Sequence, residues 1–275
     1  MKKILLSILI ASALLNVNAQ IKTPAPSPTQ TLKQDFGLSS IELVYSRPGV
    51  KGRKIFGDLV PYNKVWRTGA NSATRIKFND DVTFGGHALK AGEYALFTVP
   101  KENEWEIIIN KGSANWGTEY KMEDDIFRVK AKPMKLDQPV ETFTMQFANV
   151  KSNSTDLHIM WDRTAVSIPI TTDIDTKIMG QINNAMTKDT HPYFQSAMYY
   201  LENGKDLNQA VMWFDKGIEQ NPKAYYMYYQ KALALSKLGK KTEAKVTAQK
   251  SMDLARELKN DDYVLLNEKL LAELK

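Results

Sequence analysis

The sequence predicts an all-β antiparallel sandwich, jelly-roll-like, over residues 38–171, followed by an all-α tetratricopeptide-like helical domain over residues 172–275. Short runs of alternating apolar residues, separated by Gly, Pro and Asn, continue to Ile170 without an intervening helical pattern, as in sandwiches and barrels. After Thr171 the apolar period lengthens to that of a helix. The helical part also contains an internal repeat, which is typical of tetratricopeptide arrays.

The first residues have the pattern of a signal peptide, predicted over residues 1–19. Lys2 and Lys3 precede an apolar run that is too short to span a bilayer, and small residues precede Gln20. We therefore expect cleavage near Ala19 and an exported, soluble protein, periplasmic or extracellular. The chain has no Cys, so packing alone must stabilise the exported protein.

Composition argues against several classes of protein. The formal net charge of +6 is mild for a chain of 275 residues and, together with export, argues against a nucleic-acid partner. No later stretch has the length of a membrane span. Residues 20–37 are expected to be a Pro/Ser/Thr-rich tether, because prolines alternate with small polar residues near its start.

The β-domain is predicted to contain about ten short strands. Gly85 and Gly86 predict a tight hairpin turn, because glycine accepts the positive φ that such turns need. Residues 93–99 are apolar on both faces, which is typical of a central strand. The predicted strands are residues 41–46, 74–78, 82–84, 87–90, 93–99, 105–109, 127–132, 141–147, 157–161 and 165–170.

The helical part is predicted to contain helices at residues 173–188, 192–203, 207–220, 224–238, 241–259 and 262–274. Ala210 and Ala244 lie 34 residues apart, the tetratricopeptide period. In that register Phe214 occupies the aromatic position of the first copy, whereas Ala248 replaces it in a degenerate second copy. Because about three units normally make a free-standing array, we expect these helices to pack on the β-domain or on a partner.

A long loop at residues 45–74 separates two predicted strands. It carries six Lys or Arg residues, four Gly and a single acid, Asp58. Loops of this length are uncommon unless functional or disordered, and its apolar residues argue against disorder. We therefore expect the loop to fold over one end of the β-domain and to present cationic donors.

This loop supplies the predicted ligand-binding residues, which are Arg47, Arg53, Trp66, Arg67, Thr68 and Asn71. Arginine binds carboxylate, phosphate or sulfate through two parallel hydrogen bonds, and an exposed Trp, here or at Trp116, can stack on a sugar ring. The ligand would be small and either anionic or a glycan. Alternatively, the arginines bind loop carbonyl groups and the Trp residues close the end of the sandwich.

Three segments carry a family resemblance: SRPGVKGRKIFGDLVPYNKVWRTGANSAT, LKAGEYALFTVP and WDRTAVSIPI. They resemble an exported bacterial family catalogued as domain of unknown function 2911, over about residues 41–170. The helical tail is also similar to that of family members. The resemblance implies the extent of the β-domain and brings no activity or catalytic residues with it.

Other candidate residues are few. The three His residues lack the spacing of metal ligands, so we predict no metal site and no cofactor. Glu93 and Glu106 lie in apolar strands and could serve as a buried acid or base. Tyr226 and Met227 are predicted to face outward from a helix toward a protein partner. Motifs of nucleophile elbows, phosphate loops and zinc proteases are missing from the sequence.

Three hypotheses follow. In the first, the protein binds a small anionic or glycan ligand at the loop and a protein partner through its helices. In the second, it is an exported hydrolase that uses the loop for its substrate and Glu93 or Glu106 for proton transfer. In the third, it is a structural scaffold in which only the repeats act. The first is favoured, and the surroundings of Arg47 and Arg67 should distinguish the three.

Overall fold

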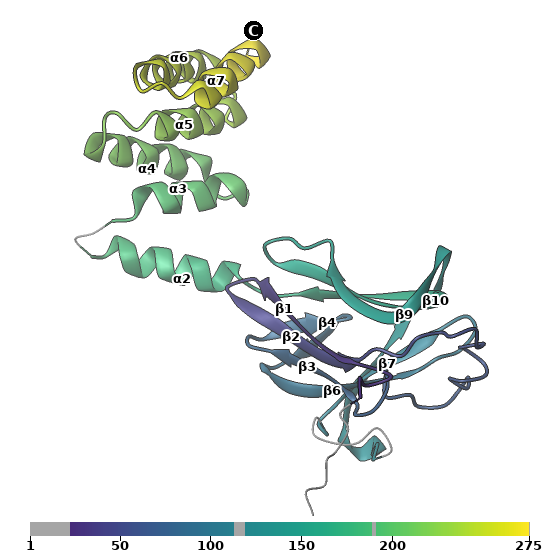
Figure 1. Ribbon diagram of the computed structural model, residues 1–275. Coiled ribbons are helices and arrows are strands. Elements are labelled where there is room, and N and C mark those ends of the chain that lie inside the picture. The colour runs from purple at the N-terminus through teal and green to yellow at the C-terminus, as the bar shows by residue number, and fades with distance from the viewer. Residues whose placement is uncertain (1–22, 113–118, 189–190, 275) are drawn as a thin grey trace, which may run out of the picture. The chain divides into compact units, whose positions relative to one another are not determined.

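The computed structural model describes residues 23–112, 119–188 and 191–274, which form two compact units (Figure 1). The first unit extends to Ile174 and the second begins at Asp175. The predicted signal peptide, residues 1–19, and Trp116 lie outside the described residues.

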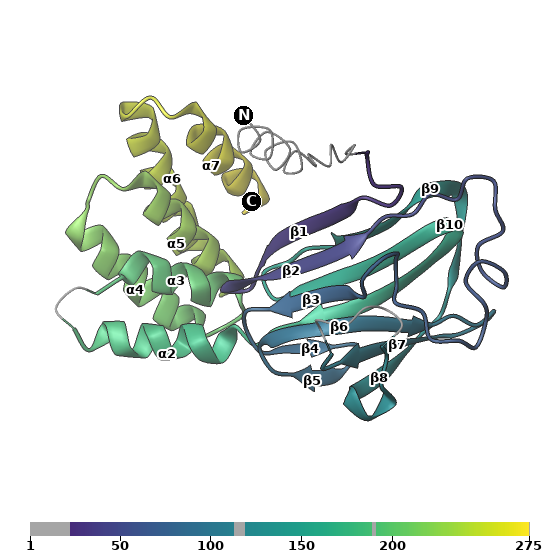
Figure 2. The same ribbon diagram turned by 60° about the horizontal axis from the view of Figure 1, so that its bottom comes forward.

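The first unit is a sandwich of two antiparallel sheets, as predicted (Figure 2). One sheet has the strand order β1-β2-β3-β6-β7-β8 and the other has the order β5-β4-β10-β9. The strands of the described residues are β1 (Thr29–Phe36), β2 (Ser39–Ser46), β3 (Thr74–Phe78), β4 (Val82–Phe84), β5 (His87–Leu89), β6 (Gly92–Val99), β7 (Trp105–Asn110), β8 (Asp125–Ala131), β9 (Met134–Ala148) and β10 (Ser154–Thr171). A single 3-10 turn, Met122–Asp124, precedes β8.

Strand β1 lies within the segment that was predicted to be a tether, so the β-domain begins earlier than residue 38. It pairs antiparallel with β2 along its whole length. Two of the inward positions of β1 are the half-buried Gln30 and Gln34. Because polar residues occupy these positions, the sequence of β1 shows only a weak alternation of apolar and polar residues. The Tyr45 hydroxyl donates to Gln30 Oε1 at 2.8 Å and links the side chains of the two strands.

Strand β10 joins two predicted strands, residues 157–161 and 165–170, into one. Its pairing with β9 shifts register on both sides of Asp162, which has a φ of 52°. Such a bulge bends a strand without ending it, which explains why the sequence pattern is interrupted there. The predicted hairpin between β4 and β5 is present, with φ values of 55° at Gly85 and 89° at Gly86.

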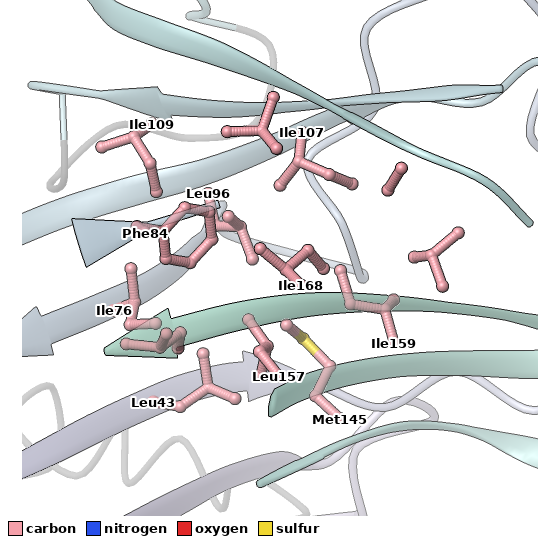
Figure 3. Packing of buried hydrophobic residues seen from close by; sticks show 14 of the residues in the cluster. Leu43, Ile76, Phe84, Leu96, Ile107, Ile109, Met145, Leu157, Ile159 and Ile168 are labelled. Atoms are coloured by element: carbon pink, nitrogen blue, oxygen red, sulfur yellow. The ribbon is translucent and has the colours of Figure 1, made fainter. Parts of the chain in front are cut away.

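The main core lies between the two sheets (Figure 3). Leu43, Ile76 and Leu96 enter it from the six-stranded sheet, and Phe84 and Ile168 enter it from the four-stranded sheet. Strand β6 lies between β3 and β7 and is buried on both faces from residue 95 to 99, as predicted for a central strand.

The second unit is helical. Its helices are α2 (Asp175–Met186), α3 (Tyr193–Glu202), α4 (Leu207–Gln220), α5 (Tyr225–Lys237), α6 (Lys241–Glu257) and α7 (Asp261–Glu273). From α3 onward each helix packs on the next. Asp206 caps α4 by accepting from the backbone N–H groups of Asn208 and Gln209.

Helix α4 buries one face because small and aromatic residues recur at helical spacing. Ala210, Phe214 and Gly217 of that helix are buried, and Ala210 and Phe214 share a cluster with Ala197 and Leu201 of α3. In the next pair, Ala232 of α5 packs with residues of α6. Within the described residues, no helix combines the length and the apolar composition that crossing a membrane requires.

Candidate functional site

A cavity of about 370 Å³ lies in the β-unit beside the long loop. Its wall combines the loop with the segment before β1 and with one residue of β10. The lining residues are Pro26, Ser27, Pro48, Gly49, Lys51, Arg53, Leu59, Val60, Val65, Trp66, Arg67, Gly69, Ala70 and Trp161.

The loop is held in place by backbone pairing at two points. Trp66 pairs with Thr98 at the end of β6, with N···O distances of 2.7 and 2.9 Å, and Gly49 forms a bridge with Thr142 of β9. Gly69 has a φ of 149°, and a Cβ atom there would lie 3.0 Å from the Ser46 carbonyl oxygen. Glycine at this position therefore lets the loop pass close to β2.

Aromatic side chains form one wall of the cavity. The rings of Trp66 and Trp161 are stacked, and the edge of Phe143 packs against both of them. Trp66 also donates its indole N–H to the Gly69 carbonyl at 3.0 Å. Trp66 therefore combines the two expected roles, since it lines the cavity and also closes the end of the sandwich.

Arg47 and Arg53 are tied to the protein itself. Arg47 donates to the Phe143 carbonyl at 3.1 Å and to Thr144 Oγ1 at 2.9 Å, and it does not line the cavity. Arg53 lines the cavity but donates to the carbonyl groups of residues 50 and 49, at 3.0 and 2.6 Å. Their geometry matches the alternative in which loop arginines bind backbone oxygens.

Arg67 differs from both. Its side chain makes no hydrogen bond or ion pair with any described residue, and its Nε atom is fully buried without a partner. Trp161, which is 2% exposed, likewise has a buried Nε1 atom without a partner. An unpaired buried donor costs about 1–3 kcal/mol. Both residues line the same cavity.

Thr68 and Asn71 do not line the cavity and instead support it. The Thr68 hydroxyl is within 3.3 Å of the Trp66 carbonyl and within 3.2 Å of Thr98 Oγ1. The Asn71 amide donates to the Ser27 carbonyl at 3.1 Å, which positions a lining residue. Sequence reasoning missed Trp161 and Ser27, because only the folded chain brings them beside the loop.

The two candidate carboxylates lie away from this cavity. Glu93 pairs with Arg75 at 3.6 Å. Glu106 accepts from Lys101 Nζ at 2.6 Å and from Arg128 at 2.8 Å, and these hydrogen bonds hold the pKa of Glu106 below its usual value. Neither residue lines the cavity, and no cluster of three possible metal ligands occurs among the described residues.

The prediction that Met227 faces outward is wrong. Met227 is buried, and its sulfur would lie 2.9 Å from a Cβ atom added at Gly217 of α4. It is buried because α5 packs between α4 and α6. Tyr226 is half-buried, and its ring meets that of Phe194 at 5.1 Å and 79°.

The first unit is thus an antiparallel sandwich with a ligand-sized cavity, and the second is a tetratricopeptide-like helical array. The chain belongs to the family described as Protein of unknown function (DUF2911), whose model matches residues 27–170. This match includes β1 and agrees with the early start of the β-domain. No curated protein matched the chain.

A tetratricopeptide repeat model matches residues 225–258, which contain α5 and α6. This is the copy that was predicted to be degenerate, with Ala248 at the aromatic position. Ala232, Ala244 and Ala248 are fully buried in one cluster, so small side chains replace the aromatic contact. Tetratricopeptide repeats indicate a role in protein–protein interaction.

Proposed function

We propose that the protein is an exported binding protein whose cavity holds a small anionic or glycan ligand and whose helical repeats contact a protein partner. The observation that carries the ligand proposal is Arg67, a lining residue of the cavity whose buried Nε–H has no partner among the described residues. We also propose export from the signal-peptide pattern of residues 1–19, with the mature protein in the periplasm or outside the cell.

Charge in the cavity supports an anion. Lys51, Arg53 and Arg67 line it, and the described lining residues include no Asp or Glu. A concave site with charges of one sign and low-dielectric walls focuses their potential on a ligand. The volume of about 370 Å³ lies near the lower end of small-molecule sites, which run from about 300 to 1,000 Å³.

Two alternatives receive less support. A hydrolase would need an acid or base beside its substrate, whereas Glu93 and Glu106 are ion-paired away from the cavity. A scaffold in which only the repeats act would give no functional reason for the unpaired buried N–H groups of Arg67 and Trp161. The helical repeats serve both the proposed function and the scaffold, so they do not separate the two.

A thermal-shift screen of the mature chain tests the proposal. The probes are sodium phosphate, sulfate, acetate, citrate, N-acetylglucosamine and cellobiose, each at constant ionic strength. At least one probe should raise the melting temperature of the wild type and lose its effect in Arg67→Gln. Arg75→Gln is the matched control, because Arg75 lies on β3 outside the cavity.

If no probe shifts the melting temperature, or if Arg67→Gln responds like the wild type, the proposed ligand site is wrong. Deletion of residues 175–275 then tests the scaffold alternative. That alternative requires the deletion to abolish partner capture while Arg67→Gln leaves capture unchanged.

A further inference from the structure

We infer that the ligand of this cavity is a carboxylate attached to an apolar body, and not a sugar or a free phosphate. The inference rests on the proposed function and names the ligand class. It comes from the residues of the cavity wall, which include cations, very few side-chain acceptors and exposed apolar side chains.

The wall of the cavity carries several N–H groups and positive charges. Arg67 Nε and Trp161 Nε1 are both buried N–H groups without a partner. Both nitrogen atoms are enclosed by the protein, and Arg67 differs from Trp161 in that its side chain is only half-buried. Lys51 adds a further cation to the wall. A group that accepts hydrogen bonds and carries negative charge would pair with the guanidinium of Arg67 and with Lys51.

Acceptors are scarce on the same wall. Among the described lining residues, the Ser27 hydroxyl is the only side-chain oxygen. Backbone oxygens that could accept are largely occupied: Gly49 O binds Arg53, Gly69 O binds Trp66, and Arg67 O binds the Thr74 N–H. A sugar has many hydroxyl donors, which would remain unpaired here, and each unpaired buried donor opposes binding.

The apolar part of the wall distinguishes a carboxylate from a free phosphate. Leu59 and Val65 line the cavity with side chains that are 44% and 38% exposed, and the half-buried Trp66 lies on the same wall. A small inorganic anion leaves this surface without a partner, whereas an apolar group on the ligand would bury it at about 25 cal/mol per Å². An aryl or alkyl carboxylate uses both parts of the wall.

The test is isothermal titration calorimetry on the mature chain with four probes: phenylacetate, phenylacetamide, inorganic phosphate and methyl glucoside. Phenylacetamide has nearly the shape of phenylacetate but exchanges a charged acceptor for a donor. Phenylacetate should bind at least about tenfold more tightly than the other three probes, since hydrogen bonds to a charged group are the strong ones.

Variants locate the binding. Arg67→Lys keeps the positive charge but loses the Nε–H and the planar fork, and should weaken phenylacetate binding about tenfold. Arg75→Gln should bind like the wild type. Arg67→Lys and the phenylacetamide comparison decide the question.

Several results would overturn the inference. Equal affinity for phenylacetamide would show that the charge and the acceptor are not recognised. Phenylacetate binding that is unchanged in Arg67→Lys would place the carboxylate elsewhere. Binding of phosphate or methyl glucoside that depends on Arg67 and exceeds that of phenylacetate would reject the carboxylate but leave the proposed ligand-binding function standing. If none of the four probes binds, the carboxylate is rejected, and the thermal-shift screen decides the proposed function.

Discussion

The indole rings of Trp66 and Trp161 lie nearly parallel, with centroids 5.8 Å apart and an interplanar angle of 14°. Trp66 belongs to the long loop and Trp161 to β10, so their contact joins the loop to the four-stranded sheet. Both residues also line the cavity. The shape of the cavity therefore depends on the same packing that stabilises this end of the sandwich.

Replacing Trp66 should destabilise the β-unit. Trp66→Ala removes ring contacts to Phe56, Trp105, Phe143 and Trp161, and we expect a loss of about 3 kcal/mol in the free energy of unfolding. Trp66→Phe should cost less, because a ring remains. Urea unfolding followed by near-ultraviolet circular dichroism measures the loss. Met122→Ala is the control, since that side chain is 67% exposed, and equal stability of all three variants would contradict the packing argument.

The ion pairs of Glu106 predict a pH dependence of stability. Its pKa in the folded protein is lowered from 4.5, chiefly by the hydrogen bond from Lys101 and then by that from Arg128. The stabilisation is therefore present above the unfolded pKa and is lost as pH falls through the folded pKa. Glu106→Gln should lower the free energy of unfolding by about 1–2 kcal/mol at pH 7.

The difference between the wild type and Glu106→Gln should shrink as the pH falls below 4.5. Denaturant titrations from pH 3 to pH 8 measure it. The control is Glu104→Gln, which removes an exposed pair with Lys130 and should cost less than about 1 kcal/mol at any pH. A difference for Glu106→Gln that does not change with pH would rule out the ion-pair explanation.

The two glycines of the β4–β5 turn should respond differently to Ala. Both have positive φ, but a Cβ atom at Gly85 would lie 2.5 Å from Val129 Cγ1, whereas one at Gly86 would meet nothing within 4 Å. Gly86→Ala should cost about 1–2 kcal/mol for the left-handed backbone alone. Gly85→Ala should cost clearly more, as measured by thermal unfolding, and equal losses would show that Val129 moves away freely.

The two copies of the helical repeat have different residues at equivalent positions. Placing the residue of one copy in the other should lower the stability of the helical unit. Phe214 is fully buried, so Phe214→Ala should lower the free energy of unfolding of the helical unit by about 3–5 kcal/mol. Ala248→Phe, at the equivalent position, should also destabilise it, by about 1–3 kcal/mol, because Ala248 is fully buried. Far-ultraviolet circular dichroism during urea unfolding measures both, and a stabilising Ala248→Phe would show an unfilled space in the second copy.

The sequence predicted the loop as a site but not the role of each residue in it. Arg47, Arg53 and Arg67 are the same residue type in one segment, and composition treats them alike. Arg47 became structural because β9 brings the Phe143 carbonyl within 3.1 Å of its Nε. The Arg67 side chain was left without a partner among the described residues, with its Nε buried. These distinctions depend on contacts between residues far apart in the chain.

The sequence by itself determined the two-unit plan, the helices and most strands, since apolar periods of two and 3.6 residues decide which face of an element can be buried. The tertiary structure decided the remainder. In the folded chain the polar strand β1 pairs with β2, strand β10 continues through the bulge at Asp162, and Met227 is buried against Gly217. The tertiary structure also assembled the cavity, because backbone pairing and long-range packing, which leave no local pattern in the sequence, bring Ser27, Arg67 and Trp161 together.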